Sequence, residues 1–276
     1  MEHPPTILRA LLFDWAGTTV DYGSRAPVEA FVEVFRRSGI ELSTAEARGP
    51  MGRAKRDHIA AICALPRVAE AWRLWHDRTP NDSDVDRLYA DFLPLQTGVL
   101  AGHCDVIPGV PETVAECRRR GLKIGSTTGY TRDLMGVVVP LSRAGGFDPD
   151  VVICADDVQR GRPAPWMIFR AAERLDVFPM TAVVVVDDTA VGIEAGLNAG
   201  AWTVAVTKTG NCLGLSEQEI SQLDEADLAA RLGAAAADFQ RLGAHHVIES
   251  VADLLPFLDN LACAGPKLTI MSPGPK

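Results

Sequence analysis

Short apolar runs rich in β-branched residues alternate along the chain with longer amphipathic segments, and this alternation predicts βα units and a parallel sheet. Each run has the length of a strand and precedes a loop rich in Asp, Gly, Thr or Pro. Because ligands bind beside the carboxyl ends of strands in open α/β sheets, we expect these loops to share one crevice. The predicted strands are residues 7–13, 122–126, 151–154, 182–186 and 203–206, with a short edge strand at His246–Ile248.

Residues 23–102 interrupt this alternation with helical patterns and no strand pattern. We therefore predict an α/β fold with an inserted α-helical cap domain: a core of residues 1–22 and 103–262, a cap of 23–102 and a flexible tail of 263–276. The predicted cap helices are residues 27–38, 54–63, 68–77 and 83–97, and the predicted late core helices are residues 218–242 and 250–261, the last with Ser250 as its N-cap.

Composition narrows the range of functions. Lys and Arg number 27 against 36 Asp and Glu, a formal net charge of −9, which argues against a nucleic-acid surface. An anionic substrate stays open, because a metal ion and a few local cations can dominate a pocket. The six cysteines are scattered, as expected for reduced thiols. Without a secretory leader or an apolar run of bilayer length, we expect a cytoplasmic protein that binds no membrane.

Acidic residues follow two of the predicted strands. Asp14 ends the first strand and is placed to act as a nucleophile toward phosphorus or as a metal ligand. Asp187 and Asp188 follow another, and adjacent acids are costly unless a cation compensates for their repulsion. Magnesium prefers one or two carboxylates with waters and substrate oxygens. Taken alone, Asp14 fits a simple turn and the acidic pair fits a helix N-cap equally well.

Two further loops suit an anion. The turn at residues 125–130 offers hydroxyl and backbone N–H groups between a strand and a helix, which makes an anion cradle. Arg162 precedes a helix that Pro163 or Pro165 would open, and its guanidinium could hold phosphate oxygens in a fork. Such turns are common, however, and Arg162 alone reads as a surface arginine.

A lysine stands at the start of a cap helix. Lys55 lies in the first turn, with His58 three residues later on the same face. A lysine must lose its proton to attack a carbonyl, and its ordinary pKa is about 10.4. The helix dipole, neighbouring Arg53 and Arg56, and partial burial would lower that pKa. The alternative is a solvated lysine in a basic turn.

The order of these features is similar to that of the haloacid dehalogenase superfamily, over nearly the whole chain up to about Leu261. The resemblance implies a doubly wound parallel sheet with an inserted cap, and Asp14 as the nucleophile that becomes phosphorylated. It also implies that Thr128 and Arg162 bind the transferring phosphoryl group.

The same resemblance implies a Mg2+ cofactor held by Asp14, the backbone carbonyl of Ala16 and Asp188, with Asp187 as a supporting acid.

Superfamily phosphatases carry an aspartate two positions after the nucleophile to protonate the leaving oxygen, and here that position is Ala16. A general acid contributes about 10²–10⁴-fold, so an ordinary phosphomonoesterase is not expected to lack it.

Ala16 together with the cap lysine resembles the phosphonoacetaldehyde hydrolases (phosphonatases) of this superfamily. The matching segments are DWAGTTVDYG, MGRAKRDHI, GSTTGYT, GRPAPWM and VVDDT. In that family the lysine forms an imine with the aldehyde, and carbon–phosphorus cleavage then releases an enamine that needs no acid. The resemblance implies Lys55 as the Schiff-base former, His58 as a proton shuttle, and Met51, Gly52 and Tyr130 as residues that shape the substrate pocket.

Two positions depart from the family pattern: Ser24 replaces a cysteine at the core–cap hinge, and Gly192 stands where many superfamily members carry another acid.

The alternative functions are a sugar-phosphate phosphatase or mutase, and a non-catalytic binding protein on the same scaffold. The expected partner is a small-molecule phosphonate. The family resemblance and the helix with Trp72 and Trp75 suggest a homodimer through the cap.

Overall fold

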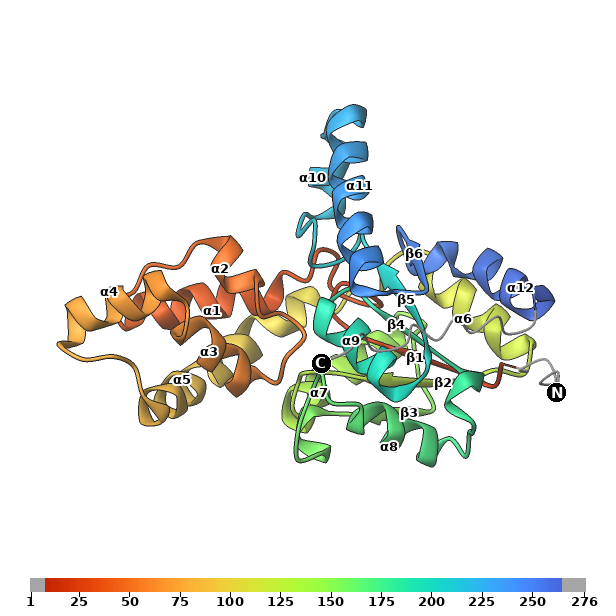
Figure 1. The fold of residues 1–276 in the computed structure, drawn as a ribbon, viewed down its shortest axis with the longest axis horizontal. Helices are drawn as coiled ribbons and strands as arrows, with labels where there is room; N and C mark the ends of the chain where they lie inside the picture. The colour runs from red at the N-terminus through yellow and green to blue at the C-terminus, as the bar shows by residue number, and fades with distance from the viewer. Residues whose placement is uncertain (1–7, 265–276) are drawn as a thin grey trace, which may run out of the picture.

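The structure, a computed structural model that describes residues 8–264, contains one six-stranded sheet (Figure 1). All strand pairs are parallel, in the order β3-β2-β1-β4-β5-β6, so the predicted doubly wound α/β fold is confirmed. The strand order reverses between β1 and β4, where ligand crevices form in such sheets. The strands are β1 (Ala10–Phe13), β2 (Lys123–Thr127), β3 (Val151–Ile153), β4 (Val183–Asp187), β5 (Trp202–Val206) and β6 (His246–Ile248).

Alternate residues of the central strands enter two different hydrophobic clusters, because side chains of a strand point to opposite faces. Leu11 and Phe13 of β1 belong to one cluster, and Ala10 and Leu12 belong to the other. Helices cover both faces and bury the sheet, as parallel sheets require. On the first face lie α6 (Val110–Arg119), α7 (Arg132–Ala144) and α12 (Leu254–Ala264), and on the second lie α8 (Trp166–Arg174), α9 (Ala190–Ala199) and α11 (Glu225–Leu242).

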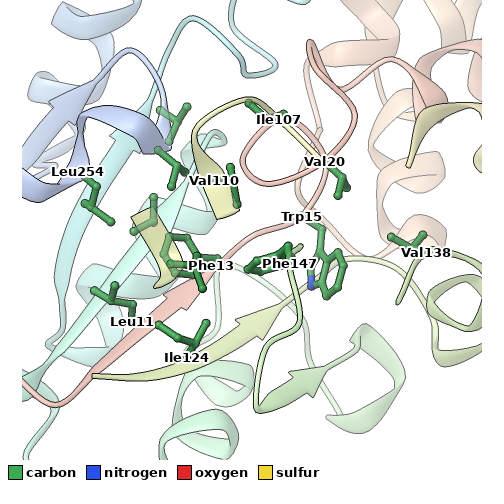
Figure 2. Packing of buried hydrophobic residues seen from close by; sticks show 14 of the residues in the cluster. Leu11, Phe13, Trp15, Val20, Ile107, Val110, Ile124, Val138, Phe147 and Leu254 are labelled. Atoms are coloured by element: carbon green, nitrogen blue, oxygen red, sulfur yellow. The ribbon is translucent and has the colours of Figure 1, made fainter. Parts of the chain in front are cut away.

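Aromatic rings connect the first face to the loop that follows β1. Figure 2 shows Phe147 between Phe13 and Trp15, with Leu11 and Ile124 beside them. Both contacts of Phe147 are edge-on, with ring centroids 6.0 Å from Phe13 and 5.2 Å from Trp15, a geometry that aromatic pairs favour. This packing fixes the start of the loop that carries Asp14.

Five helices gather apart from the sheet and form the inserted cap (Figure 1). They enclose their own hydrophobic cluster, in which Phe31, Trp72 and Phe92 are fully buried. Trp72 therefore cannot contribute to a dimer surface, contrary to the expectation from its helix, whereas Trp75 is 68% exposed. The helices are α1 (Ala26–Arg37), α2 (Thr44–Arg48), α3 (Lys55–Cys63), α4 (Pro66–His76) and α5 (Asp82–Leu100).

Helix α2 was absent from the sequence prediction. Its start carries a capping box, in which Ser43 accepts from the backbone N–H of Glu46 and Glu46 accepts from that of Ser43. The predicted helix 218–242 is in fact two helices, α10 (Glu217–Ser221) and α11, because Asp224 caps the start of a new helix. Ser250 is an N-cap as predicted, although a short 3₁₀ turn at Val251–Asp253 precedes α12.

The five cap helices lie within residues 26–100, and the domain bounds stay a prediction. Of the predicted tail, residues 263 and 264 end α12, and residues 265–276 lie outside the described part of the chain. Within residues 8–264, no helix has the length and apolar character needed to span a membrane. The five cysteines in this part with a described side chain are free thiols.

Candidate active site

Asp14 lies directly after β1, at the carboxyl edge of the sheet. Its backbone N–H extends the ladder to the carbonyl of Val186, 2.9 Å away, so the carboxylate rests on a rigid element. Burial raises its pKa to about 7, against the lowering effect of Arg162. A buried carboxylate at a strand end suits a nucleophile that a cation must hold in its ionised form.

Asp187 and Asp188 meet Asp14 from the neighbouring strand. One carboxylate oxygen of each of the three acids lies within 4.8 Å of the others, and all three side chains are buried. Asp188 accepts from Thr18 Oγ1 at 3.2 Å and from the backbone N–H of Asn211 at 2.7 Å. Burial, reinforced by Asp14 and Asp187, raises the pKa of Asp188 well above its ordinary value.

Arg162 is the cation that faces these acids. Its Nη1 lies 2.7 Å from Asp14 Oδ1, and its Nη2 lies 3.2 Å from Asp187 Oδ2. Nη2 also donates to the carbonyl and the hydroxyl of Thr127, so this buried guanidinium joins β2 to the two acids of the edge. As predicted, Arg162 precedes a helix, and Pro165 is its N-cap.

The acidic cluster fits a divalent metal ion. Three buried carboxylates face one guanidinium, which leaves a formal charge of −2 when the acids are ionised. The donor atoms are carboxylate oxygens, the ligand type that Mg2+ prefers. A bound divalent cation would reverse the raised pKa values of Asp14 and Asp188, because nearby positive charge favours the ionised form.

Gly192 has a steric explanation. A Cβ atom at position 192 would lie 2.0 Å from Cγ of Asp187, so the carboxylate of Asp187 already fills the space beside α9. Asp187 is held there by the backbone N–H and the hydroxyl of Thr189, at 2.9 and 2.7 Å. The acid that many superfamily members carry at this position is therefore replaced, in space, by Asp187.

Lys55 enters the site from the cap. It is the first residue of α3 and is only 4% exposed, with Nζ 4.7 Å from the ring centroid of Tyr130 and 5.5 Å from that of Phe31. Burial is the main cause that lowers its pKa to about 7. Arg162 lowers this pKa further, whereas the predicted contributions of Arg53 and Arg56 are not among its causes. The guanidinium of Arg56 pairs with Asp86 instead. A buried lysine with a pKa near 7 holds a substantial neutral fraction that can attack a carbonyl.

His58 lies behind Lys55 and does not line the cavity. Its ring stacks on Phe31 at 3.9 Å between centroids, and Nε2 is 2.8 Å from the carbonyl of Ala47. Because a carbonyl only accepts, Nε2 carries the proton and Nδ1 is a free acceptor, with no partner among the described residues. Burial lowers the pKa of His58 well below its ordinary value, so the ring is neutral.

The cap closes over the core and leaves a cavity of about 20 Å³, enough for about one water molecule. Gly52 permits this approach: its φ is +89°, and a Cβ there would lie 2.3 Å from Thr189 Oγ1. Three predicted site residues, Asp187, Asp188 and His58, lie outside the cavity lining. The lining also contains residues that were not predicted for the site: Ser24, Pro27, Arg53, Gly129 and Thr189. The predicted residues that line the cavity are Asp14, Ala16, Met51, Gly52, Lys55, Thr128, Tyr130 and Arg162.

Sequence reasoning missed several residues that support this site. Thr18 and Asn211 hold Asp188, and Thr127 holds Arg162. Thr18 and Thr127 lie inside the recognised segments DWAGTTVDYG and GSTTGYT, so their hydroxyls close after a strand were a usable signal. Asn211 had none, because its contact with Asp188 exists only in the folded chain.

This combination of a doubly wound sheet, an inserted cap and strand-end acids facing a buried arginine defines a hydrolase class. The chain belongs to the haloacid dehalogenase-like hydrolases, whose family pattern matches residues 8–200, and a second, HAD-hydrolase-like pattern matches residues 159–254.

Within this class, the chain belongs to the phosphonoacetaldehyde hydrolase family. It is 48% identical over 249 residues to the phosphonoacetaldehyde hydrolase of Paraburkholderia xenovorans (strain LB400), covering 90% of this chain and 93% of the relative. The enzyme of that name from Bacillus cereus (strain G9842) is 40% identical over 254 residues, with 92% and 96% covered. The crystal structure of a phosphonoacetaldehyde hydrolase-like protein from Oleispira antarctica superimposes with a TM-score of 0.91 at 38% identity, covering 95% of this chain and 96% of that one. The predicted family is thus confirmed.

Proposed function

We propose that this protein hydrolyses the carbon–phosphorus bond of phosphonoacetaldehyde to acetaldehyde and phosphate. The observation that carries the proposal is the pairing, in one closed cavity, of the carboxylate Asp14 with the buried amine of Lys55, beside Ala16 at the acid position. An amine near its pKa can condense with an aldehyde, and a carboxylate can accept a phosphoryl group. A phosphomonoesterase needs the acid and has no use for the amine.

In the proposed reaction, neutral Lys55 attacks the aldehyde carbon, and the adduct loses water to form an imine. The protonated imine accepts the electron pair of the carbon–phosphorus bond and becomes an enamine, while Asp14 takes the phosphoryl group, which Arg162 and Thr128 orient. Water then hydrolyses the aspartyl phosphate. The enamine takes up a proton on carbon to return to an imine, whose hydrolysis releases acetaldehyde and frees Lys55. His58, whose Nδ1 has no partner among the described residues, is the proposed proton shuttle near the imine, while Met51, Gly52 and Tyr130 shape the pocket.

Mg2+ is the proposed cofactor, with Asp14, the carbonyl of Ala16 and Asp188 as its ligands and Asp187 as the supporting acid. When bound, it supplies positive charge that neutralises the carboxylate cluster and the phosphoryl oxygens.

Removal of divalent ions should therefore abolish phosphate release, and Asp188→Asn should lose most of its affinity for magnesium. Isothermal titration calorimetry measures the affinity, and Asp86→Asn, which changes an exposed acid of α5, is the control. Magnesium–oxygen distances near 2.1 Å at Asp14 and Asp188 are expected in a magnesium-soaked crystal. An ion bound elsewhere, or activity indifferent to a chelator, would contradict the assignment.

The pKa of Lys55 predicts a pH dependence. Its amine is neutral above about pH 7 and protonated below, so kcat/KM for phosphonoacetaldehyde should fall about tenfold per pH unit as the pH drops below 7. The rate of borohydride trapping should follow the same curve, since both need the neutral amine. Circular dichroism at each pH controls for unfolding. A flat profile between about pH 5.5 and about pH 8 would contradict a reacting lysine with a lowered pKa.

The main competing functions make different predictions in one assay. A sugar-phosphate phosphatase or mutase would act on phosphate monoesters and tolerate loss of Lys55. A non-catalytic binding protein would release no phosphate from either substrate. Phosphate release from phosphonoacetaldehyde, measured with and without magnesium beside a monoester panel, distinguishes the three, and preferential monoester cleavage would overturn our proposal.

We also propose that the protein is a cytoplasmic homodimer that acts on a small phosphonate. Its free cysteines fit a reducing compartment. The proposed cap contact would use Leu74 and Trp75, which are 69% and 68% exposed on neighbouring positions of α4.

A further inference from the structure

One cap arginine reaches both the hinge and a core loop. Arg48, the last residue of α2, donates from Nη1 to the hinge carbonyls of Gly23 and Ser24, at 2.9 and 3.3 Å. The same atom donates to Asn211 Oδ1 at 3.0 Å, and Nη2 donates to the carbonyl of Gly214 at 2.9 Å. In the described part of the chain, Arg48 forms no ion pair, so its guanidinium is held by neutral acceptors, two from the hinge and two from the core loop.

The hinge segment that Arg48 binds has an unusual backbone. Asp21, Gly23 and Ser24 have φ values of +55°, +85° and +50°, in the left-handed region. Non-glycine residues persist there only when surrounding contacts hold them. Two of the bonds from Arg48 go to the carbonyls of this segment, so the arginine helps to fix the hinge in the closed conformation.

The core loop at residues 207–214 is shaped to receive the arginine. Gly214 has a φ of +66°, and a Cβ there would lie 2.5 Å from Cζ of Arg48, so any side chain would displace the guanidinium. Asn211 returns a bond from Nδ2 to the backbone carbonyl of Arg48, at 3.3 Å. This reciprocal pairing joins cap and core by side chains that lie outside the cavity lining.

The same loop holds an acid of the site. The backbone N–H of Asn211 donates to Asp188 Oδ2 at 2.7 Å, while its side chain is engaged by Arg48. We propose that Arg48 and Asn211 are positioning residues that couple closure of the cap to the placement of Asp188. The proposal rests on the proposed function for the role of Asp188 in the reaction, but its tests below need no substrate.

The accessibility of Lys55 reports closure. Lys55 is 4% exposed in the closed structure, whereas Lys123, at the start of β2 and outside the 207–214 loop, is exposed and serves as an internal reference. In magnesium-loaded protein, the rate of amine acylation at Lys55 relative to Lys123, measured by mass spectrometry, should rise about tenfold in Arg48→Met, since several hydrogen bonds are lost together. Arg48→Lys, which keeps the charge and fewer donors, should give an intermediate rate.

Arg67→Met is the matched control, because Arg67 is a cap arginine whose hydrogen bonds, among residues 8–264, go to Glu46 and the carbonyl of Glu41, both in the cap. It should leave the labelling ratio unchanged. Magnesium titrated alone by calorimetry should bind several-fold more weakly to Arg48→Met and to Asn211→Ala, and with wild-type affinity to Arg67→Met.

Unchanged Lys55 labelling in Arg48→Met and Arg48→Lys would overturn the proposal, as would faster labelling with unaltered magnesium affinity. If Arg48 had a purely structural role, Arg48→Met would lower the Tm. At temperatures well below that Tm, the Lys55 labelling rate and the magnesium affinity would then both be unchanged. Should the wild-type protein fail to cleave phosphonoacetaldehyde while these shifts are observed, the coupling would stand and the proposed function would fall.

Discussion

Asp14→Asn should abolish phosphate release from phosphonoacetaldehyde, with a loss of at least about 10⁴-fold in kcat. The amide cannot form an acyl phosphate, and the variant also loses a charged ligand for magnesium. A continuous phosphate assay at saturating substrate gives the rate, and phosphate trapped on the protein after rapid quenching reports the intermediate directly. Retention of more than a few per cent of activity would remove Asp14 from the role of nucleophile.

Stability should respond in the opposite direction. Because burial raises the pKa of Asp14 above its unfolded value, the ionised carboxylate weakens the metal-free fold at neutral pH. Asp14→Asn without magnesium should therefore melt at or above the Tm of the wild type, while Asp86→Asn should change neither activity nor Tm appreciably. A large drop in Tm would mean that the pair with Arg162 stabilises the fold more than burial of the charge destabilises it.

Lys55→Arg should lose carbon–phosphorus cleavage by about 10³-fold or more, although the positive charge is kept. A guanidinium stays protonated and cannot attack the aldehyde. In the wild type, borohydride added with substrate should trap a reduced adduct on Lys55 and inactivate the protein, as peptide mass mapping would show. Lys208→Arg, which changes a half-buried core lysine paired with Glu249, is the control and should react normally.

The outcome that decides between imine chemistry and electrostatics is the activity of Lys55→Arg. Full phosphonate cleavage in that variant would mean that charge alone explains the lysine. Ala16→Asp gives an independent view: it should raise monoester hydrolysis slightly and leave phosphonate cleavage no better. Faster phosphonate turnover in Ala16→Asp would mean that the alanine serves a different purpose.

Local patterns were sufficient to predict the sheet and the residues at its edge. Asp14, Asp187 and Asp188 follow apolar runs of strand length, and parallel strands bring such residues together by topology alone. The position of Lys55 at a helix start was equally readable. Partial burial was among the predicted causes of its lowered pKa, and burial is the main cause in the structure. The near-complete burial beneath Tyr130 and Phe31 was not readable, because it depends on how the cap packs against the core.

The features that the sequence did not reveal also depend on contacts between distant parts of the chain. Arg48 lies on a five-residue helix, and its partner Asn211 is 163 positions away, so nothing nearby in the sequence marks either residue. Trp72 and Trp75 are three residues apart on one helix and share nearly the same face. Their spacing could not show that Trp72 is buried in the cap while Trp75 is exposed.

The central place of β1 has a consequence for how the chain is made. Ala10 pairs with Lys123 on one side and Val183 on the other, so the first strand to leave the ribosome finds its nearest partner only roughly a hundred residues later. All buried members of the cap cluster, by contrast, lie between Val28 and Phe92. Domains generally fold as units during synthesis. The cap can thus complete its own interior while β1 is still unpaired, and the edge that carries Asp14, Asp187 and Asp188 can form only after β4 has been synthesised.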